Sequence, residues 1–247
     1  MPTNINMNEF AIKLGISADK LGRNMAVYEA ASELFPKLEL AECKVGLFGG
    51  TALNKIYFGK RQRLSYDLDL FAYSYKRALK ALADIGARIK YTGTFPGKKV
   101  VSTRMTYKEV VLDIVDAKAA LEEPRKLQLI DLLYYFGQLV PPIVVPSYSI
   151  EYLMAEKTMA MSDRNELKDI YDTWAGIKLL KVPDTYLNYL KRIAKDGGVK
   201  DVIGHLKHQL ANMLANAEYY DKKRVEILDQ PNPRIMLREI EAFLDRL

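Results

Sequence analysis

The sequence predicts an α+β protein in which an α/β half is followed by an all-helical half. Up to about residue 120, short apolar runs typical of strands alternate with segments of helical periodicity, and beyond residue 150 only helical patterns remain. A stretch rich in proline separates the two halves. We therefore expect an N-terminal helical segment over 1–40, an α/β core over 41–120, a connector over 121–148 and a helical domain over 149–247.

Composition narrows the class of protein. The 247 residues are 49% hydrophobic and 28% charged, which is typical of a globular chain with a sizeable core. One cysteine and two histidines argue against a disulfide framework and against a zinc cluster. The net charge of +6 favours an anionic partner such as a nucleotide or a nucleic acid.

The sequence carries no pattern of a secretory signal or a membrane span. Its first residues lack a basic segment followed by an apolar core. The uncharged stretch from Leu132 to Ile150 is almost long enough to cross a bilayer, but its three prolines would break a spanning helix. We therefore expect a cytoplasmic protein without a membrane partner.

The elements of the first half are predicted from periodicity and from turn residues. Apolar residues at helical spacing over 7–35 predict a helix, which Pro36 is expected to end. The apolar run Lys44–Phe48 stops at two glycines and predicts a strand that enters a tight turn. Thr51 is then expected to cap a short helix that reaches Phe58. The other elements expected here are strands at Leu68–Tyr73, Val100–Thr106 and Glu109–Val115 and a helix at Lys76–Asp84.

The second half is predicted to be helical throughout. The proline-rich stretch before it is interpreted as a buried helix end followed by an extended connector. No alternating pattern typical of a strand follows it. The helices expected are Ser149–Met161, Asn165–Lys181, Asp184–Lys195, Val199–Glu218 and Pro233–Leu247.

The strongest motif for chemistry lies between residues 48 and 71. Two glycines and Thr51 after a strand would present backbone N–H groups and a helix N-terminus, which together favour phosphate binding. If Leu68 and Leu70 face the core, alternation places Asp67 and Asp69 on the opposite face, where a divalent cation would relieve their repulsion. The alternative is a glycine turn with two solvent-facing acids. The combination of both features at this spacing favours phosphoryl transfer.

A third carboxylate lies in the strand-like run Val110–Val115. Asp113 interrupts this β-branched run, and burying its charge would be costly without a metal or a basic partner. Beside the strand of Asp67 and Asp69 it would complete a three-carboxylate site for two cations. The alternative is that Asp113 faces water on the open side of the sheet.

A second charged motif runs from Glu156 to Trp174. Asp169 and Asp172 lie one helical turn apart, so both can face one cleft, where Lys157 could meet a triphosphate. The alternative is a charged surface helix with a pair between Lys168 and Asp172. Spacing alone favours this alternative.

The two motifs together resemble a known family. The run Gly49-Gly50-Thr51-Ala52-Leu53 with Arg63, Ser65, Asp67 and Asp69 resembles the first motif of the AbiEii/AbiGii abortive-infection toxins, and Lys157, Arg164, Lys168, Asp169 and Asp172 resemble their downstream motif. These toxins belong to the polymerase-β-like nucleotidyltransferases. The resemblance implies a nucleotidyltransferase domain with a mixed β-sheet over 41–120, followed by an all-helical C-terminal domain that contributes Lys157 and Asp169 to the active site.

The resemblance also implies roles for individual residues. Asp67 and Asp69 would hold Mg²⁺ or Mn²⁺, Lys157 would bind the triphosphate, and Asp169 would lie in or next to the active site. Asp113 is placed as the third metal ligand and catalytic carboxylate by its strand context and not by a motif. The residues expected to contact the nucleotide are Gly49, Gly50, Thr51, Arg63, Ser65, Lys157, Arg164 and Asp172.

The function implied is that of a magnesium-dependent nucleotidyltransferase toxin from a toxin–antitoxin system for phage defence. It would transfer NMP from an NTP to an RNA, with the tRNA 3′ end as the expected acceptor, and a winged-helix regulator encoded nearby as its antitoxin. From Lys55 to Lys108 the chain has 13 basic but only 3 acidic residues, which favours an RNA acceptor. The alternatives are a protein or small-molecule hydroxyl as acceptor, or a toxin that binds NTP or RNA without catalysis.

Overall fold

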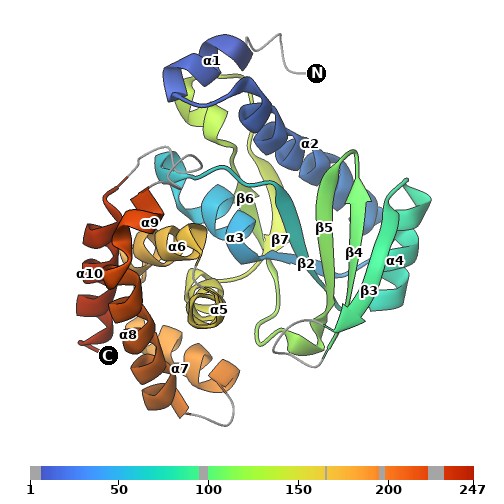
Figure 1. Ribbon diagram of the computed structural model, residues 1–247. Coiled ribbons are helices and arrows are strands. Elements are labelled where there is room, and N and C mark those ends of the chain that lie inside the picture. Colours follow the sequence, from blue (N-terminus) through green and yellow to red (C-terminus); the bar gives the residue numbers. More distant parts are fainter. Residues whose placement is uncertain (1–6, 95–99, 165, 195–197, 222–230) are drawn as a thin grey trace. The chain divides into compact units, whose positions relative to one another are not determined.

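The computed structural model divides the chain into two compact units (Figure 1). The sheet unit comprises Met1–Lys60 and Leu64–Tyr148, and the helical unit comprises Arg61–Arg63 and Ser149–Leu247. Each unit is described by itself. The residues that the structure describes are 7–94, 100–164, 166–194, 198–221 and 231–247.

A mixed seven-stranded sheet forms the centre of the sheet unit over the described residues, with strand order β3-β4-β5-β2-β1-β7-β6. Strand β2 lies between β5, to which it is parallel, and β1, to which it is antiparallel. The strands are β1 Val45–Phe48, β2 Asp67–Ala72, β3 Arg88–Thr94, β4 Val101–Tyr107, β5 Val110–Asp116, β6 Arg125–Leu129 and β7 Ile143–Ser147. This arrangement confirms the predicted α+β class, and β3 was not expected from the sequence.

Two long helices of this unit, α2 (Ala18–Leu40) and α4 (Tyr75–Asp84), pack against β5, and α2 also contacts β2 and β7. The short α1 (Met7–Leu14) precedes α2, and the Ser17 hydroxyl caps α2 by accepting from the Lys20 N–H. The prediction that Pro36 ends the helix was wrong, because α2 continues through it to Leu40. Proline removes one helical hydrogen bond, and burial of Phe35 and Leu38 on either side of Pro36 offsets this loss.

The predicted connector 121–148 contains two strands of the sheet, β6 and β7, and a 3₁₀ turn, η4 (Leu132–Phe136). Pro146 lies inside β7, where it can donate no ladder hydrogen bond. The neighbouring Ser147 hydroxyl donates instead to the Leu47 carbonyl of β1 at 2.6 Å. A side-chain hydrogen bond thus ties a proline-bearing strand to the sheet, which the sequence pattern did not indicate.

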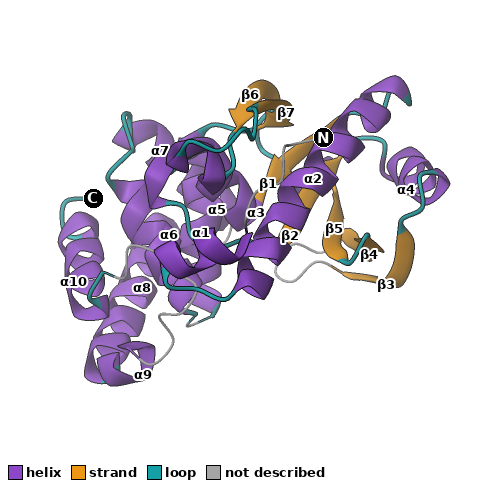
Figure 2. Ribbon diagram, turned by 90° about the horizontal axis from the view of Figure 1, so that it is seen from above, coloured by secondary structure: helices purple, strands orange, loops and turns teal. Residues whose placement is uncertain are grey.

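The helical unit contains no strand among its described residues, as predicted (Figure 2). Its helices are α5 Ile150–Asp163, α6 Leu167–Ile177, α7 Pro183–Ala194, α8 Gly198–Ala215, α9 Ala217–Asp221 and α10 Pro233–Leu244. Helix α5 packs against α6, α7 and α8, and α10 packs against α6, α8 and α9. The predicted helix boundaries at Asn165 and Lys195 lie outside the described residues.

Among the described helices, none combines the length and the apolar character that a membrane span requires.

Candidate functional site

The paired aspartates lie on one face of β2. Asp67 and Asp69 are partly exposed, whereas Leu68 and Leu70 between and beyond them are buried. Strand alternation therefore gives the arrangement expected from the sequence. Two neighbouring carboxylates on one face supply the oxygen ligands that a divalent cation prefers.

The glycine turn brings the backbone close to Asp69. Helix α3 (Gly49–Ala52) begins directly after β1 and continues as a π-helix, η1 (Leu53–Tyr57). Gly49 adopts a φ of +74°, and a Cβ atom there would lie 2.2 Å from Oδ2 of Asp69. Only glycine allows this close approach of backbone and carboxylate.

We expect Gly49→Ala to reduce nucleotidyl transfer strongly, because the added methyl group must displace the Asp69 carboxylate. The strained φ adds a stability cost of about 1–2 kcal/mol. Steady-state transfer rates and thermal unfolding check this expectation. Gly86→Ala is the matched control, since Gly86 also has a positive φ (+99°) but its Cβ would meet open space. Equal activity losses in both variants would contradict a role for Gly49 beside Asp69.

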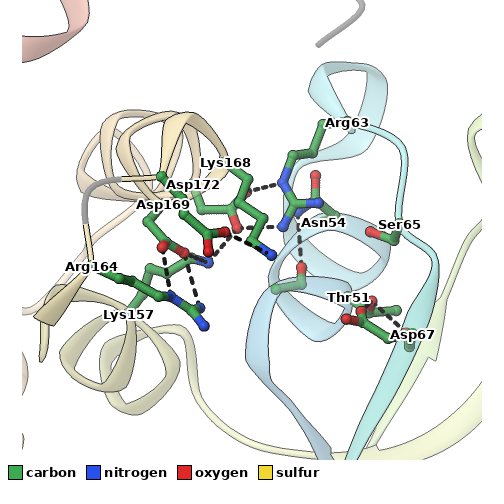
Figure 3. A network of polar contacts seen from close by, with 12 residues as sticks. Thr51, Asn54, Arg63, Ser65, Asp67, Lys157, Arg164, Lys168, Asp169 and Asp172 are labelled. Carbon is green, nitrogen blue, oxygen red and sulfur yellow. Dashed lines mark hydrogen bonds and ion pairs between the residues drawn. The ribbon is translucent and has the colours of Figure 1, made fainter. Parts of the chain in front are cut away.

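Thr51 holds β2 instead of capping the helix. Its hydroxyl donates to the Asp67 carbonyl oxygen at 2.8 Å and lies 3.3 Å from Oδ1 of Asp67 (Figure 3). The predicted cap was wrong because the turn at Gly49 starts the helix two residues earlier, with Phe48 as N-cap and no side-chain cap. Because Thr51 is only 1% exposed, its hydroxyl holds β2 from the interior of the sheet unit.

Asp113 lies beside Asp69 but has a basic partner. In the parallel pairing of β2 and β5, Asp69 is opposite Asp113, as the strand context predicts. Arg104 of β4 binds both carboxylate oxygens of Asp113, at 2.7 Å and 2.6 Å. Over the described residues there is no group of three or more acidic, histidine or cysteine side chains arranged to hold a metal. Arg104 thus engages both oxygens of the residue that the sequence predicts as the third metal ligand.

A buried polar network under the Ser65 loop was not found from the sequence. Lys55 donates to Asp131 at 2.5 Å, and Asn24 donates to the same carboxylate oxygen at 3.1 Å. The Asn24 carbonyl oxygen accepts from Lys55 at 3.3 Å and from the Ser65 backbone N–H at 3.0 Å. The network fixes the loop that leads to Asp67. The one sequence signal for it was an asparagine on the apolar side of α2.

Ser65 itself has a hydroxyl with unmet hydrogen-bonding capacity. Its side chain is buried, and its Oγ has no hydrogen-bond partner among the described residues. A buried polar atom without a partner costs about 1–3 kcal/mol. The Ser65 hydroxyl lies two residues before Asp67 in the chain, and a bound phosphate oxygen would accept a hydrogen bond from it.

The downstream motif forms a buried ion cluster in the helical unit (Figure 3). Lys157 lies 2.7 Å from carboxylate oxygens of both Asp169 and Asp172. Arg164 binds Asp169 at 2.7 Å, and Arg63 binds Asp172 through two bonds of 2.9 Å and 2.7 Å. Both carboxylates are fully buried. The structure thus brings five of the predicted site residues together.

The charges of this cluster keep both acids ionised. Burial alone would raise the pKa of Asp169, but Lys157 and Arg164 outweigh it and hold this pKa below its usual range. Burial would also raise the pKa of Asp172, but the charges of Arg63 and Lys157 outweigh it, and this pKa is lowered as well. Three basic groups thus surround two carboxylates, and the cluster carries one positive charge in excess.

Lys168 stands outside the cluster. It pairs with Glu166 at 2.9 Å, and both side chains are exposed. The surface pair between Lys168 and Asp172, favoured by spacing alone, is therefore not formed. Helical spacing suggested this pair, but Asp172 faces the interior of the unit, where Arg63 and Lys157 compensate its charge.

Comparison with solved structures shows the fold of this chain in other proteins. MenT4, a nucleotidyltransferase toxin from Mycobacterium tuberculosis H37Rv, matches with a TM-score of 0.60 and 18% identity, over 99% of this chain and 91% of MenT4. JHP933 from Helicobacter pylori matches with a TM-score of 0.54 and 16% identity, over 94% of this chain and 92% of JHP933. Among curated proteins, none is similar enough to count as a match.

A family model gives the assignment. The model described as "Nucleotidyl transferase AbiEii toxin, Type IV TA system" matches residues 39–246, which include both charged motifs. The match covers most of the sheet unit and nearly all of the helical unit. The chain therefore belongs to the AbiEii family of nucleotidyltransferase toxins from toxin–antitoxin systems.

Proposed function

We propose that this nucleotidyltransferase uses a divalent cation, Mg²⁺ or Mn²⁺, to transfer NMP from an NTP to the 3′ end of an RNA, with tRNA as the acceptor. The observation that carries the proposal is that Asp67 and Asp69 share one face of β2 and that the backbone at Gly49 approaches the Asp69 carboxylate closely. Two carboxylates beside a glycine turn fit one divalent cation and the triphosphate that it accompanies.

The reaction forms one bond and breaks one. The 3′-hydroxyl oxygen of the acceptor bonds to the α-phosphorus, the bond to the oxygen bridging to the β-phosphate breaks, and pyrophosphate leaves. The hydroxyl proton passes to solvent. A cation held by Asp67 and Asp69 would supply charge neutralisation on the phosphates during this exchange. The Ser65 hydroxyl and the N–H groups at Gly50 and Thr51 are the donors proposed for the phosphate oxygens.

The cluster in the helical unit is proposed to supply the basic group for the triphosphate. Two carboxylates accept from the Lys157 ammonium, which has three hydrogen atoms to donate. The role of Lys157, and the places of Arg63, Arg164, Asp169 and Asp172 in nucleotide binding, follow from the motif match. We propose the catalytic contribution of Asp169 as the positioning of Lys157, which it contacts at 2.7 Å.

An RNA acceptor is supported by basic side chains on the surface of the sheet unit. On α4 and β3, five lysine and arginine side chains are exposed. They are Lys76, Arg77, Lys80, Arg88 and Lys90. Of these, Arg77 pairs with Glu42 at 2.9 Å. Lys98, which belongs to the same basic stretch of sequence, lies outside the described residues.

Membership in a toxin–antitoxin family implies a cognate antitoxin. We propose that it is a winged-helix regulator encoded next to the toxin, and that the toxin acts in the cytoplasm in abortive infection by phage. Co-expression of the neighbouring open reading frame with the toxin tests this. Restored growth supports the proposal, and arrest that persists contradicts it.

Labelling identifies the acceptor directly. The protein is incubated with Mg²⁺, total cellular RNA and protein, and each of the four α-³²P NTPs in turn. We expect label in RNA that migrates with tRNA, and no label with the Asp67→Ala variant. Label in protein or in a small solute would instead assign another acceptor. Growth arrest that survives Asp69→Asn without any labelled product would favour a toxin that acts by binding.

A further inference from the structure

Four side chains form one row across four strands of the sheet unit. Asp69 of β2 is opposite Asp113 of β5, Asp113 is opposite Arg104 of β4, and Arg104 is opposite Tyr91 of β3. Residues that are opposite each other in a sheet share a face. The row therefore extends from the proposed cation site to the edge strand on a single face of the sheet.

Arg104 is held from two sides in this row. Its Nε and Nη2 donate to the two oxygens of Asp113, and its Cζ lies 5.5 Å from the centre of the Tyr91 ring. The hydrogen bonds to Asp113 raise the pKa of Arg104, and the charge of Asp69 contributes in the same direction. Arg104 thus keeps its charge, interacts electrostatically with Asp69 and is held in one orientation by Asp113 and Tyr91.

The pair with Arg104 changes what Asp113 can do. A carboxylate that accepts a bidentate guanidinium has its two favoured oxygen directions occupied, and the guanidinium does not lose its proton at physiological pH. A cation at Asp113 would lie close to the Arg104 guanidinium, and the repulsion between the two positive charges disfavours its binding there. Asp67 and Asp69 of β2 are the two carboxylates to which the proposed function assigns the cation.

Stability alone does not account for the pair. The Arg104 side chain is 42% exposed and that of Asp113 is 19% exposed. Ion pairs with this degree of exposure contribute about 0–1 kcal/mol to folding. The position of the pair is what matters, because it places the positive charge of Arg104 in the same row as Asp69, two strands away.

We propose that Arg104 takes the place of a second divalent cation, so that this site binds one cation, at Asp67 and Asp69, and not two. This inference rests on the proposed function for its catalytic meaning. During transfer the guanidinium would provide fixed positive charge near the reacting phosphate, while Asp113 and Tyr91 orient it.

The number of bound Mn²⁺ ions tests the proposal without requiring activity. Free and bound Mn²⁺ are measured by electron paramagnetic resonance on the full chain. We expect one Mn²⁺ per wild-type chain and a second, weaker one in Arg104→Ala, where Asp113 becomes available. The double variant Arg104→Ala/Asp113→Asn should return to one ion, and Arg104→Lys should keep one. Arg88 of β3 is exposed and lies on the same face of the sheet as Arg104. Arg88→Ala is therefore the matched control and should bind one ion.

Two results would overturn the proposal. These are two Mn²⁺ ions in the wild-type chain, or a single ion in Arg104→Ala that circular dichroism shows to be folded. A wild type that binds two ions but transfers nucleotides refutes this inference alone. A wild type that binds one ion but transfers nothing refutes the proposed function and leaves the ion count standing. Binding of no ion would contradict both.

Discussion

Asp69→Ala is expected to lower nucleotidyl transfer by about 10³-fold or more, since it removes a proposed cation ligand at the reacting phosphate. The sheet unit should remain folded, because Asp69 is partly exposed while the leucines that pack β2 are untouched. Incorporation of α-labelled NMP measures the loss, and thermal unfolding measures the stability.

Asp84→Ala is the matched control for this variant. Asp84 is an exposed aspartate at the end of α4 in the same unit, and its removal should leave the transfer rate unchanged. An Asp69→Ala protein with at least a tenth of the wild-type rate would contradict the assignment of Asp69 as a cation ligand. Thermal unfolding shows whether the Asp69→Ala protein is folded, so that a loss of transfer caused by unfolding is recognised.

Asp172→Ala is expected to destabilise the helical unit by about 3–5 kcal/mol, because it leaves the buried Arg63 without its bidentate partner. Lys157 would keep Asp169 as a partner, at 2.7 Å. Urea denaturation followed by circular dichroism measures the change in the free energy of unfolding.

Glu166→Ala supplies the comparison, since it breaks the exposed pair with Lys168. Its expected effect is at most about 1 kcal/mol. Similar effects of the two substitutions would show that the buried cluster does not hold the helical unit together. If instead Asp172→Ala unfolds the chain, Asp172→Asn, which preserves the volume and one of the two acceptor oxygens, should recover part of the stability.

The aspartate pair could be predicted from the sequence because its basis is local. Alternation along one strand decides that Asp67 and Asp69 share a face, and the leucines between and beyond them decide which face it is. The positive φ at Gly49 and its closeness to Asp69 could not be predicted in the same way. The two residues are 20 positions apart, and their contact depends on the pairing of β1 with β2.

The Arg104–Asp113 pair shows why cross-strand partners were missed. The hairpin of β4 and β5 turns through Lys108 and Glu109, which adopt φ values of 45° and 69°. Two-residue hairpin turns with positive φ usually carry Asn-Gly or Asp-Gly, so Lys-Glu gave no signal for the turn. Without the turn the register is undetermined, and a shift by one residue would place Arg104 on the opposite face from Asp113.

The charged cluster of the helical unit could be predicted in part. Helical spacing places Asp169 and Asp172 on one face of α6. The partner Arg63 is 109 positions earlier in the chain, and no periodic pattern links residues at that distance. Here the family resemblance supplied the residues, and the structure supplied their contacts.

The most direct test of the central claim compares two labels on the same NTP. Purified tRNA is incubated with the protein, Mg²⁺ and the NTP selected by the labelling experiment, with ³²P at either the α- or the γ-phosphate. Nucleotidyl transfer predicts that the α label enters the tRNA and the γ label is recovered as pyrophosphate. Transfer of the γ label to the RNA, or no consumption of any NTP, would contradict the claim.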